Sequence, residues 1–165
     1  MSDKPYRPNV GIALFNAAGQ VLIGRRFGDD GPEIILPGLE WQMPQGGIDA
    51  DEDPREAVMR ELWEETGVVS AEHLGETGWM TYEFPPYDGP PSHRLAKFRG
   101  QRQKWFALRH TGSDDEIDPL ASRNGQPAEF DCWRWERLGR VADLVVPFRR
   151  DVYRTVAELF ARFAV

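Results

Sequence analysis

Acidic residues are concentrated on one short predicted helix, where they could bind a metal ion. Glu61, Glu64 and Glu65 lie three and four residues apart within 54–66, so on a helix they share one arc about 100° wide. Like charges so placed repel by roughly 0.2–0.5 kcal/mol a pair unless a cation lies among them. Carboxylates, together with phosphates and waters, are the ligands that Mg²⁺ prefers. The spacing suits a metal–phosphate site, although a solvated acidic face paired with Arg60 would give the same pattern.

The sequence also defines both ends of this helix. Asp53 can cap the first turn, with Glu56 three residues on as in a capping box, and Pro54 suits the first helical position. Gly67 can adopt the left-handed conformation that ends a helix. We therefore predict a helix over 54–66. We expect four apolar side chains to pack it against a core: Val58, Met59, Leu62 and Trp63.

The segment 46–68, GGIDADEDPREAVMRELWEETGV, resembles the Nudix box at every fixed position. That pattern is G-x5-E-x7-R-E-U-x-E-E-x-G-U, where U is bulky and apolar. The matching residues are Gly46, Glu52, Arg60, Glu61, Leu62, Glu64, Glu65, Gly67 and Val68. So many constraints over so short a segment form a specific motif, which structural context must support. The resemblance implies a metal-dependent hydrolase that cleaves a nucleoside diphosphate linked to a further group.

Beyond the box, the chain resembles one branch of the family. The segments that carry this resemblance are PYRPNVGIALFN (5–16), GRRFG (24–28), WQMPQGGID (41–49), QRQKWFAL (101–108), EFDCWRW (129–135) and VVPFRRDVYRTV (145–156). They are similar to bacterial RNA 5′-pyrophosphohydrolases, a branch that includes dinucleoside polyphosphate hydrolases. The resemblance implies removal of pyrophosphate from the 5′-triphosphate end of RNA, leaving a 5′-monophosphate. Hydrolysis of dinucleoside polyphosphates is the alternative.

The resemblance also implies a catalytic and metal-binding set. Mg²⁺ or Mn²⁺ would be held by Glu61, Glu64, Glu65 and Glu129, together with Gly46. Without the family, the favoured interpretation of Glu129 is a surface carboxylate in a loop. The general base stays open among Glu64, Glu65 and Glu129. Two further box residues are expected to support this set: Arg60, by fixing a ligand carboxylate, and Glu52, by bracing the loop–helix junction.

Five residues are expected to bind substrate on the same grounds. Tyr82 and Phe148 resemble an aromatic pair that stacks on a base, an interaction worth roughly 1–3 kcal/mol. Arg26 resembles the position that reaches a phosphate or base, and Arg149 is a basic residue beside Phe148. Trp41 would shape the pocket floor. Packing in the core is the alternative role for each of the three aromatic residues.

Composition limits the class of protein. A chain of 165 residues predicts one domain, 1–165, and contains no apolar run near the roughly 18 residues of a membrane span. The net charge of −7 argues against general nucleic-acid binding, but local basic residues would suffice for a terminal phosphate chain. The N-terminus lacks the pattern of a signal peptide, and the one cysteine, Cys132, fits a reducing compartment. We expect a cytoplasmic enzyme without a membrane role; the oligomeric state stays open.

Hydrophobic patterning predicts the remaining elements. Strands are expected at 10–15 and 21–23 as a hairpin, and at 41–45, 75–83, 104–109 and 130–135, followed by a helix over 148–163. Loops are expected at 28–40, 85–91 and 111–128. This order predicts an α/β (α+β) fold, a Nudix-type α/β/α sandwich with a mixed β-sheet. The loops 28–40 and 84–94 would flank the base site and decide substrate preference. A catalytically silent binding module is the remaining alternative, and the intact set of carboxylates argues against it.

Overall fold

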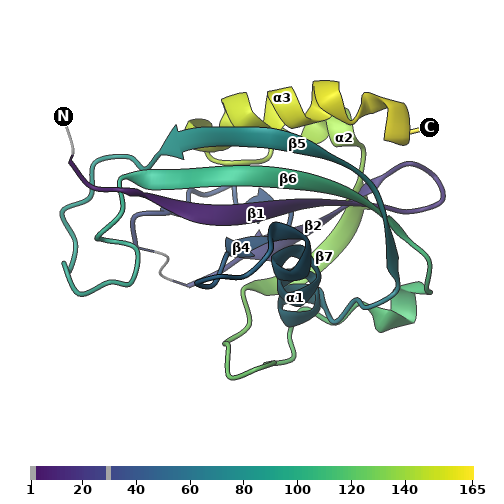
Figure 1. The fold of residues 1–165 in the computed structure, drawn as a ribbon, viewed down its shortest axis with the longest axis horizontal. Coiled ribbons are helices and arrows are strands. Elements are labelled where there is room, and N and C mark those ends of the chain that lie inside the picture. The colour runs from purple at the N-terminus through teal and green to yellow at the C-terminus, as the bar shows by residue number, and fades with distance from the viewer. Residues whose placement is uncertain (1–2, 29–30) are drawn as a thin grey trace.

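A seven-stranded mixed sheet forms the middle layer of the computed structural model, which describes residues 3–28 and 31–165 (Figure 1). The strands are β1 (Tyr6–Phe15), β2 (Val21–Arg26), β3 (Trp41–Gln42), β4 (Gln45–Gly47), β5 (Ala71–Glu83), β6 (Gly100–His110) and β7 (Phe130–Glu136). The main path runs β3-β2-β1-β6-β5, with β4 paired to β1 and β7 paired to β2. β1 and β6 are parallel, and the other pairs are antiparallel.

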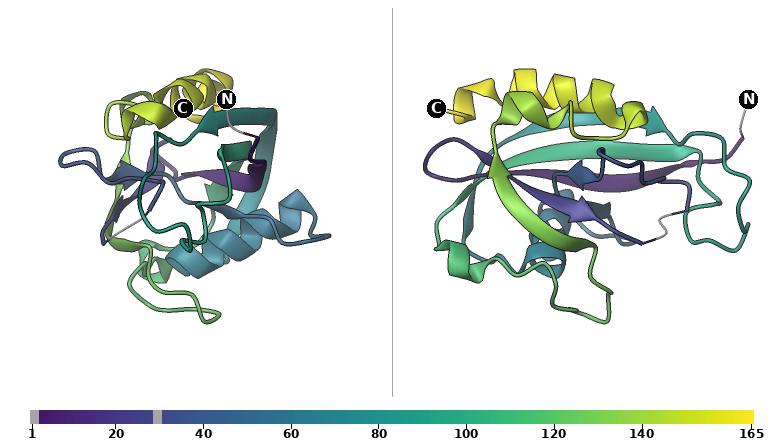
Figure 2. Two further views of the ribbon diagram at one scale, coloured as in Figure 1. Left: turned by 90° about the vertical axis from the view of Figure 1, so that its left-hand side faces the viewer. Right: turned by 180° about the vertical axis from the view of Figure 1, so that it is seen from behind.

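Helices cover both faces of this sheet. α1 (Pro54–Thr66) lies below it in Figure 1, whereas α2 (Leu138–Val141) and α3 (Arg150–Leu159) lie above it. The end-on view in Figure 2 shows the same three layers. Short 3₁₀ turns occupy Asp114–Glu116, Pro147–Arg149 and Ala161–Phe163. The predicted α/β/α sandwich with a mixed sheet is confirmed. Within the described residues, no helix is long and apolar enough to span a membrane.

Side chains of β1 alternate between two apolar layers, as expected for a central strand. Val10, Ile12 and Leu14 pack toward α1, where Val58 and Leu62 join them. The intervening side chains face α3 and form the second cluster with Trp105, Tyr153 and Val156 among others. The sheet is therefore anchored on both faces. The paired strands β1 and β4 can therefore hold polar side chains in fixed positions.

α1 begins and ends where the sequence predicts. The Asp53 side chain accepts a hydrogen bond from the Arg55 backbone N–H at 2.8 Å, and Gly67 adopts a left-handed conformation with φ 83°. The expected apolar face is wrong at Trp63, which is 37 % exposed. The buried stripe consists instead of Ala57, Val58, Glu61, Leu62 and Thr66. The core side of α1 therefore includes Glu61, and the acidic arc borders the apolar core.

Three predicted strands differ in detail from the observed ones. The expected strand 41–45 is two strands, because Pro44 has no N–H for a ladder; its carbonyl accepts from the Ile12 N–H at 2.9 Å. The hairpin of β1 and β2 pairs only at Phe15 and Val21, after which β2 pairs with β7 and β3. β5 starts at residue 71 rather than 75, since bulges in β5 hide its alternation.

The C-terminal helix is shorter than predicted. Its α-helical part is Arg150–Leu159, and the rest of 148–163 is mostly the two flanking 3₁₀ turns. Val152, Val156 and Phe160 are buried as expected, whereas Leu159 is exposed. Of the predicted loops, 85–91 is irregular, 111–128 contains one 3₁₀ turn, and 28–40 is irregular over its described residues; residues 29–30 lie outside them.

Candidate active site

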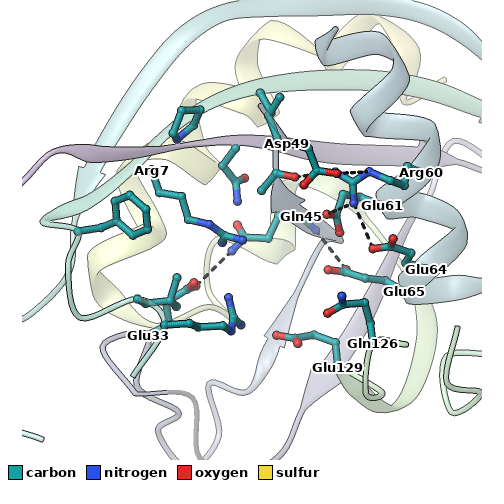
Figure 3. Close-up of a pocket in the computed structure, with 18 of the residues that line it drawn as sticks. Arg7, Glu33, Gln45, Asp49, Arg60, Glu61, Glu64, Glu65, Gln126 and Glu129 are labelled. Carbon is teal, nitrogen blue, oxygen red and sulfur yellow. Dashed lines mark hydrogen bonds and ion pairs between the residues drawn. The ribbon is translucent and has the colours of Figure 1, made fainter. Parts of the chain in front are cut away.

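A pocket of about 630 Å³ opens beside the start of β1, β4 and one face of α1 (Figure 3). We call it the main pocket. Loop residues complete its wall from three directions: Glu33, the segment 94–98 and the segment 126–129. The sheet fixes the floor, because β4 is hydrogen-bonded to β1 from Asn9 to Gly11.

Four carboxylates converge on one side of the main pocket. Glu61, Glu64 and Glu65 extend from α1, and Glu129 extends from the loop before β7 (Figure 3). We call these four residues the carboxylate end. The Glu65 Oε2 accepts a hydrogen bond from the Gln45 backbone N–H at 3.3 Å, which ties α1 to β4. The structure thus brings together the four glutamates that the sequence selected.

Arg60 organises this end through several charge-assisted hydrogen bonds. Its guanidinium donates to Glu61 Oε1 at 2.8 Å and to Glu64 Oε2 at 3.2 Å. It also donates to both oxygens of Glu52 at 2.8 Å and to the Gly47 carbonyl at 2.8 Å. Bidentate pairing of this kind fixes geometry as well as charge. Arg60 thus contacts two of the predicted ligand carboxylates and Glu52, while the supporting roles expected of Arg60 and Glu52 remain predictions.

The carboxylate end carries more negative charge than its surroundings neutralise. Burial raises the pKa of Glu61 to about 7 despite Arg60, with the Glu64 charge acting in the same direction. Burial also raises the pKa of Glu65 well above its ordinary value, helped by the charges of Glu129 and Glu61. Clustered carboxylates that resist ionisation are what a divalent cation would stabilise. The donor chemistry therefore fits a hard divalent metal ion.

The carboxylates of Glu61 and Glu64 accept hydrogen bonds from Arg60, and that of Glu65 accepts one from Gln45. Among residues 3–28 and 31–165, no group of three or more His, Cys, Asp or Glu side chains is already arranged to hold a metal ion. Asn124 adds to this by donating from its amide to Glu64 Oε1 at 2.7 Å. Cation binding here would exchange some of these contacts for metal–oxygen contacts.

These raised pKa values predict that the metal-free protein loses stability as the pH rises. Glu61 is ionised above about pH 4.5 when unfolded but stays protonated up to about pH 7 when folded. Below pH 4.5 the stability contribution of protonated Glu61 is fully present. Between pH 4.5 and 7 this contribution is lost, and the free energy of unfolding falls by roughly 3 kcal/mol in total. Urea unfolding in EDTA at pH 5 and pH 7.5 measures this loss. Glu61→Gln should flatten the difference; an equal pH dependence in the variant would contradict the assignment.

Gly46 brings the backbone of β4 against the carboxylate end. A Cβ atom at this position would overlap the carboxylate of Glu61. A Cβ on the neighbouring Gly47 would likewise collide with the guanidinium of Arg7. The two glycines of the box therefore allow side chains from α1 and β1 to lie against one short strand. The predicted role of Gly46 as a carbonyl ligand remains a prediction.

Gly46→Ala is expected to displace Glu61 and lower kcat about 10–100-fold, the range seen when support of a metal site is lost. Overpacking should also cost about 1–3 kcal/mol of folding stability. Steady-state kinetics and thermal unfolding measure the two effects. Gly139→Ala is the matched control, because a Cβ on Gly139 in α2 meets no atom within 4 Å. Equal activity of both variants would show that the close approach at Gly46 is unimportant.

Basic side chains also line the main pocket. Arg7, Arg94 and Lys97 line it together with Phe98, and we call these four residues the basic end. Burial and the nearby charge of Arg94 lower the pKa of Arg7, while Glu61 and Glu129 act against this. Figure 3 shows Arg7 across Gln45 from the glutamates. One pocket thus presents Arg7 on the side away from the four glutamates, with Glu33 nearby and Arg60 among the glutamates.

Most of this basic end could not be predicted from the sequence. Arg7 lies inside the segment 5–16 that carries the family resemblance, so its place in that segment was the available signal. Lys97 is one of several scattered basic residues, and its position in the sequence carries no signal of its own. Arg94 ends the predicted loop 84–94 and Phe98 lies just beyond it, and no sequence pattern indicates a role for either residue.

The five predicted substrate-binding residues lie outside the lining of the main pocket. Arg26, Tyr82 and Arg149 are only 3 %, 7 % and 1 % exposed, whereas Trp41 and Phe148 are partly buried. The Tyr82 and Phe148 rings lie 5.7 Å apart at 38°, so the two predicted partners are neighbours. Their expected contact with a base remains a prediction.

Glu33 covers this group from loop 28–40. Its carboxylate accepts from Gln45 Nε2 at 3.2 Å and from Gln101 Nε2 at 3.0 Å, and it forms an ion pair with Arg149. Its backbone carbonyl accepts from the guanidinium of Arg26. Glu33 is itself buried and lines the main pocket. The loop expected to flank the base site therefore reaches the predicted substrate-binding arginines through one carboxylate.

Comparison with known proteins agrees with the geometry. The NUDIX domain model matches residues 5–156. The RNA pyrophosphohydrolase of Azorhizobium caulinodans is 51 % identical over 166 residues, covering 99 % of this chain and 97 % of the relative. The RNA pyrophosphohydrolase of Afipia carboxidovorans is 53 % identical over 163 residues, covering 98 % and 96 %.

Solved structures show the same fold at low sequence identity. The E. coli dihydroneopterin triphosphate pyrophosphohydrolase aligns with a TM-score of 0.62 and 19 % identity, covering 95 % of this chain and 97 % of that one. A C. elegans Ap4A hydrolase aligns with a TM-score of 0.60 and 18 % identity, covering 97 % and 99 %. The sequence match, the sandwich and the position of the box helix at the pocket together establish that the chain belongs to the Nudix family.

Proposed function

We propose that this protein is an RNA 5′-pyrophosphohydrolase, which removes pyrophosphate from 5′-triphosphorylated RNA and leaves a 5′-monophosphate end. The observation that carries the proposal is sequence identity of about 50 % over nearly the full length to relatives named RNA pyrophosphohydrolases. We take residues 1–165 to act as a single domain. RNA as substrate and the single cysteine, Cys132, suit a cytoplasmic setting.

In this proposal Glu61, Glu64, Glu65 and Glu129 of the carboxylate end would hold one or more divalent ions, Mg²⁺ or Mn²⁺. When bound, such an ion supplies charge neutralisation at phosphoryl oxygens and lowers the pKa of water. The Gly46 carbonyl is the proposed backbone ligand. Arg60 keeps Glu61 and Glu64 at fixed positions, and Glu52 holds Arg60 in turn.

The other side of the pocket is suited to the substrate's phosphate chain. Arg7 is positioned by β1 between the charges of Arg94 and the glutamates, so its guanidinium can orient phosphoryl oxygens toward the carboxylate end. One carboxylate among Glu64, Glu65 and Glu129 accepts the proton of the attacking water. The phosphoanhydride bond breaks as the new P–O bond forms, and pyrophosphate, or two phosphates in sequence, leaves.

The base of the 5′ nucleotide is assigned to the buried group beneath Glu33. Tyr82 and Phe148 would stack on it, Arg26 and Arg149 would contact its edge or phosphate, and Trp41 would shape the floor. Because Arg149 now pairs with Glu33, base binding in this place requires loop 28–40 to shift. In this proposal, the shift of loop 28–40 helps to determine which substrates can bind.

Dinucleoside polyphosphates are the second candidate substrates, since they offer the same phosphoanhydride bonds and the chain's charge of −7 disfavours long polyanions. The test compares kcat/KM for 5′-triphosphorylated RNA and for diadenosine tetraphosphate at equal Mg²⁺ concentrations. We expect the RNA to be preferred, with release of pyrophosphate or phosphate and a monophosphorylated RNA product. Hydrolysis of the tetraphosphate with no release from RNA would reject the proposal in favour of the alternative.

A further inference from the structure

A second hollow of about 320 Å³ adjoins the main pocket. The two share Phe98, which lines both. The wall of the second hollow is formed by Lys4, Pro32, Glu83, Phe84, Pro85, Pro86, Tyr87, Ala96, Phe98 and Arg99. Three aromatic rings and three prolines form the apolar part of its wall, and its charged groups come from the ends of β5 and β6 and from the N-terminus. None of the catalytic residues lies in it.

The aromatic side chains of this second hollow are held in place. The Tyr87 hydroxyl donates to the Pro90 carbonyl at 2.9 Å, and its ring contacts His93 edge-on with centroids 6.3 Å apart. The Phe84 ring packs edge-on against Tyr82 with centroids 6.1 Å apart. Fixed rings beside an apolar wall offer stacking surfaces for a nucleobase, and stacking of this kind tolerates any base.

Charge at the junction of the two hollows is positive. The stretch 94–104 contains five basic residues and no acidic one, in a chain whose net charge is −7. Arg99 is neutralised by Glu83 at 2.6 Å. Within the part of the chain that the structure describes, Arg94 and Lys97 form no ion pair with a carboxylate, and the Lys97 ammonium lies 5.3 Å from the Phe98 ring centroid. Uncompensated cations therefore flank the ring that joins the hollows.

We propose that the RNA chain leaves the main pocket across Phe98 and that the second hollow binds the base of a nucleotide downstream of the 5′ end. Arg94 and Lys97 contact the phosphodiester groups between the two bases. Alternating stacking surfaces and cations are the usual means of binding a single strand without reading its sequence. The inference rests on the proposed RNA substrate, and it predicts affinity that grows with RNA length.

Equilibrium binding in EDTA tests the hollow without catalysis. The ligands are 5′-triphosphorylated hexanucleotides that carry 2-aminopurine at position 2, 3 or 4. Stacking quenches the fluorescence of 2-aminopurine. We expect quenching for at least one position, and at least a fivefold weaker Kd for Tyr87→Leu and for Lys97→Gln. Trp79→Leu and Arg154→Gln are matched controls, since neither residue lines either hollow. No quenching at any position, or equal weakening by the controls, would overturn the inference.

Kinetics separate this inference from the proposed function. With Mg²⁺, KM should fall about tenfold from a triphosphorylated dinucleotide to a hexanucleotide, the effect of one stacked base. Lys97→Gln should raise KM more for the hexanucleotide than for the dinucleotide, and it should reduce the salt slope of log Kd for the hexanucleotide by about 0.7. RNA hydrolysis with a KM independent of length would reject the second hollow and leave the proposed function intact. Absence of RNA hydrolysis would reject the proposed function itself, while the binding assay still decides on the hollow.

Discussion

Glu65→Gln is expected to lower kcat by about 10²–10⁴-fold while the protein remains folded. Glu65 lies at the carboxylate end, between α1 and the loop that carries Glu129. The amide oxygen introduced by the substitution can still accept the hydrogen bond from the Gln45 backbone N–H, which is 3.3 Å long in the wild type. The negative charge of the carboxylate is lost. The substitution therefore separates the role in chemistry from the role in packing.

The same substitution should not destabilise the metal-free protein. Burial and the charges of Glu129 and Glu61 raise the pKa of Glu65, so a neutral side chain removes an unfavourable ionisation from the folded state. We expect a melting temperature in EDTA at pH 7.5 equal to or above that of the wild type. Glu56→Gln, the same change at an exposed position of α1, is the control and should leave kcat and stability unchanged. An unchanged kcat in Glu65→Gln would refute the assignment of this carboxylate.

Glu33→Ala is expected to cost about 3–5 kcal/mol of folding stability, the usual cost of removing one partner from a buried ion pair. Arg149 is among the most deeply buried side chains of the chain, and Glu33 is its ion-pair partner on loop 28–40. Gln45 and Gln101 also lose the acceptor to which their amides donate. Urea unfolding at pH 7.5 measures the loss.

Two further variants define the cause of that loss. Glu33→Ala combined with Arg149→Met should recover much of the stability, because the double change also removes the guanidinium that the Glu33 carboxylate balanced. Asp151→Ala removes the exposed partner of Arg154, at 3.4 Å, and should change stability by less than about 1 kcal/mol. If Glu33→Ala were as mild as Asp151→Ala, the Glu33 network would not anchor loop 28–40.

The sequence predicted best the features that depend on neighbours along the chain. α1 has its predicted bounds, because Asp53, Pro54 and Gly67 act locally on its two ends. The grouping of Glu61, Glu64 and Glu65 followed from helical spacing alone. Bringing Glu129 to the same pocket required the family resemblance, since the loop before β7 reaches α1 only through the tertiary fold.

Features that depend on distant contacts were not predictable in this way. Trp63 fits an apolar stripe on α1, but the sheet contacts the side that includes Ala57 and Glu61 instead. Glu33 lies in a loop without periodicity, and its burial results from partners on β4, β6 and the turn Pro147–Arg149. The basic end likewise forms because β1 and β6 pair in parallel, which brings Arg7 toward the segment 94–98.

The central claim is that the carboxylate end of the main pocket hydrolyses the 5′-triphosphate end of RNA. The most direct measurement follows 5′-triphosphorylated RNA, labelled at its β- and γ-phosphates, with Mg²⁺ and either the wild-type protein or Glu64→Gln. The proposal predicts release of labelled pyrophosphate or phosphate and a 5′-monophosphate RNA from the wild type, with release reduced at least a hundredfold in the variant. Labelled phosphates that stay on the RNA with the wild type, or equal release by both proteins, would contradict it.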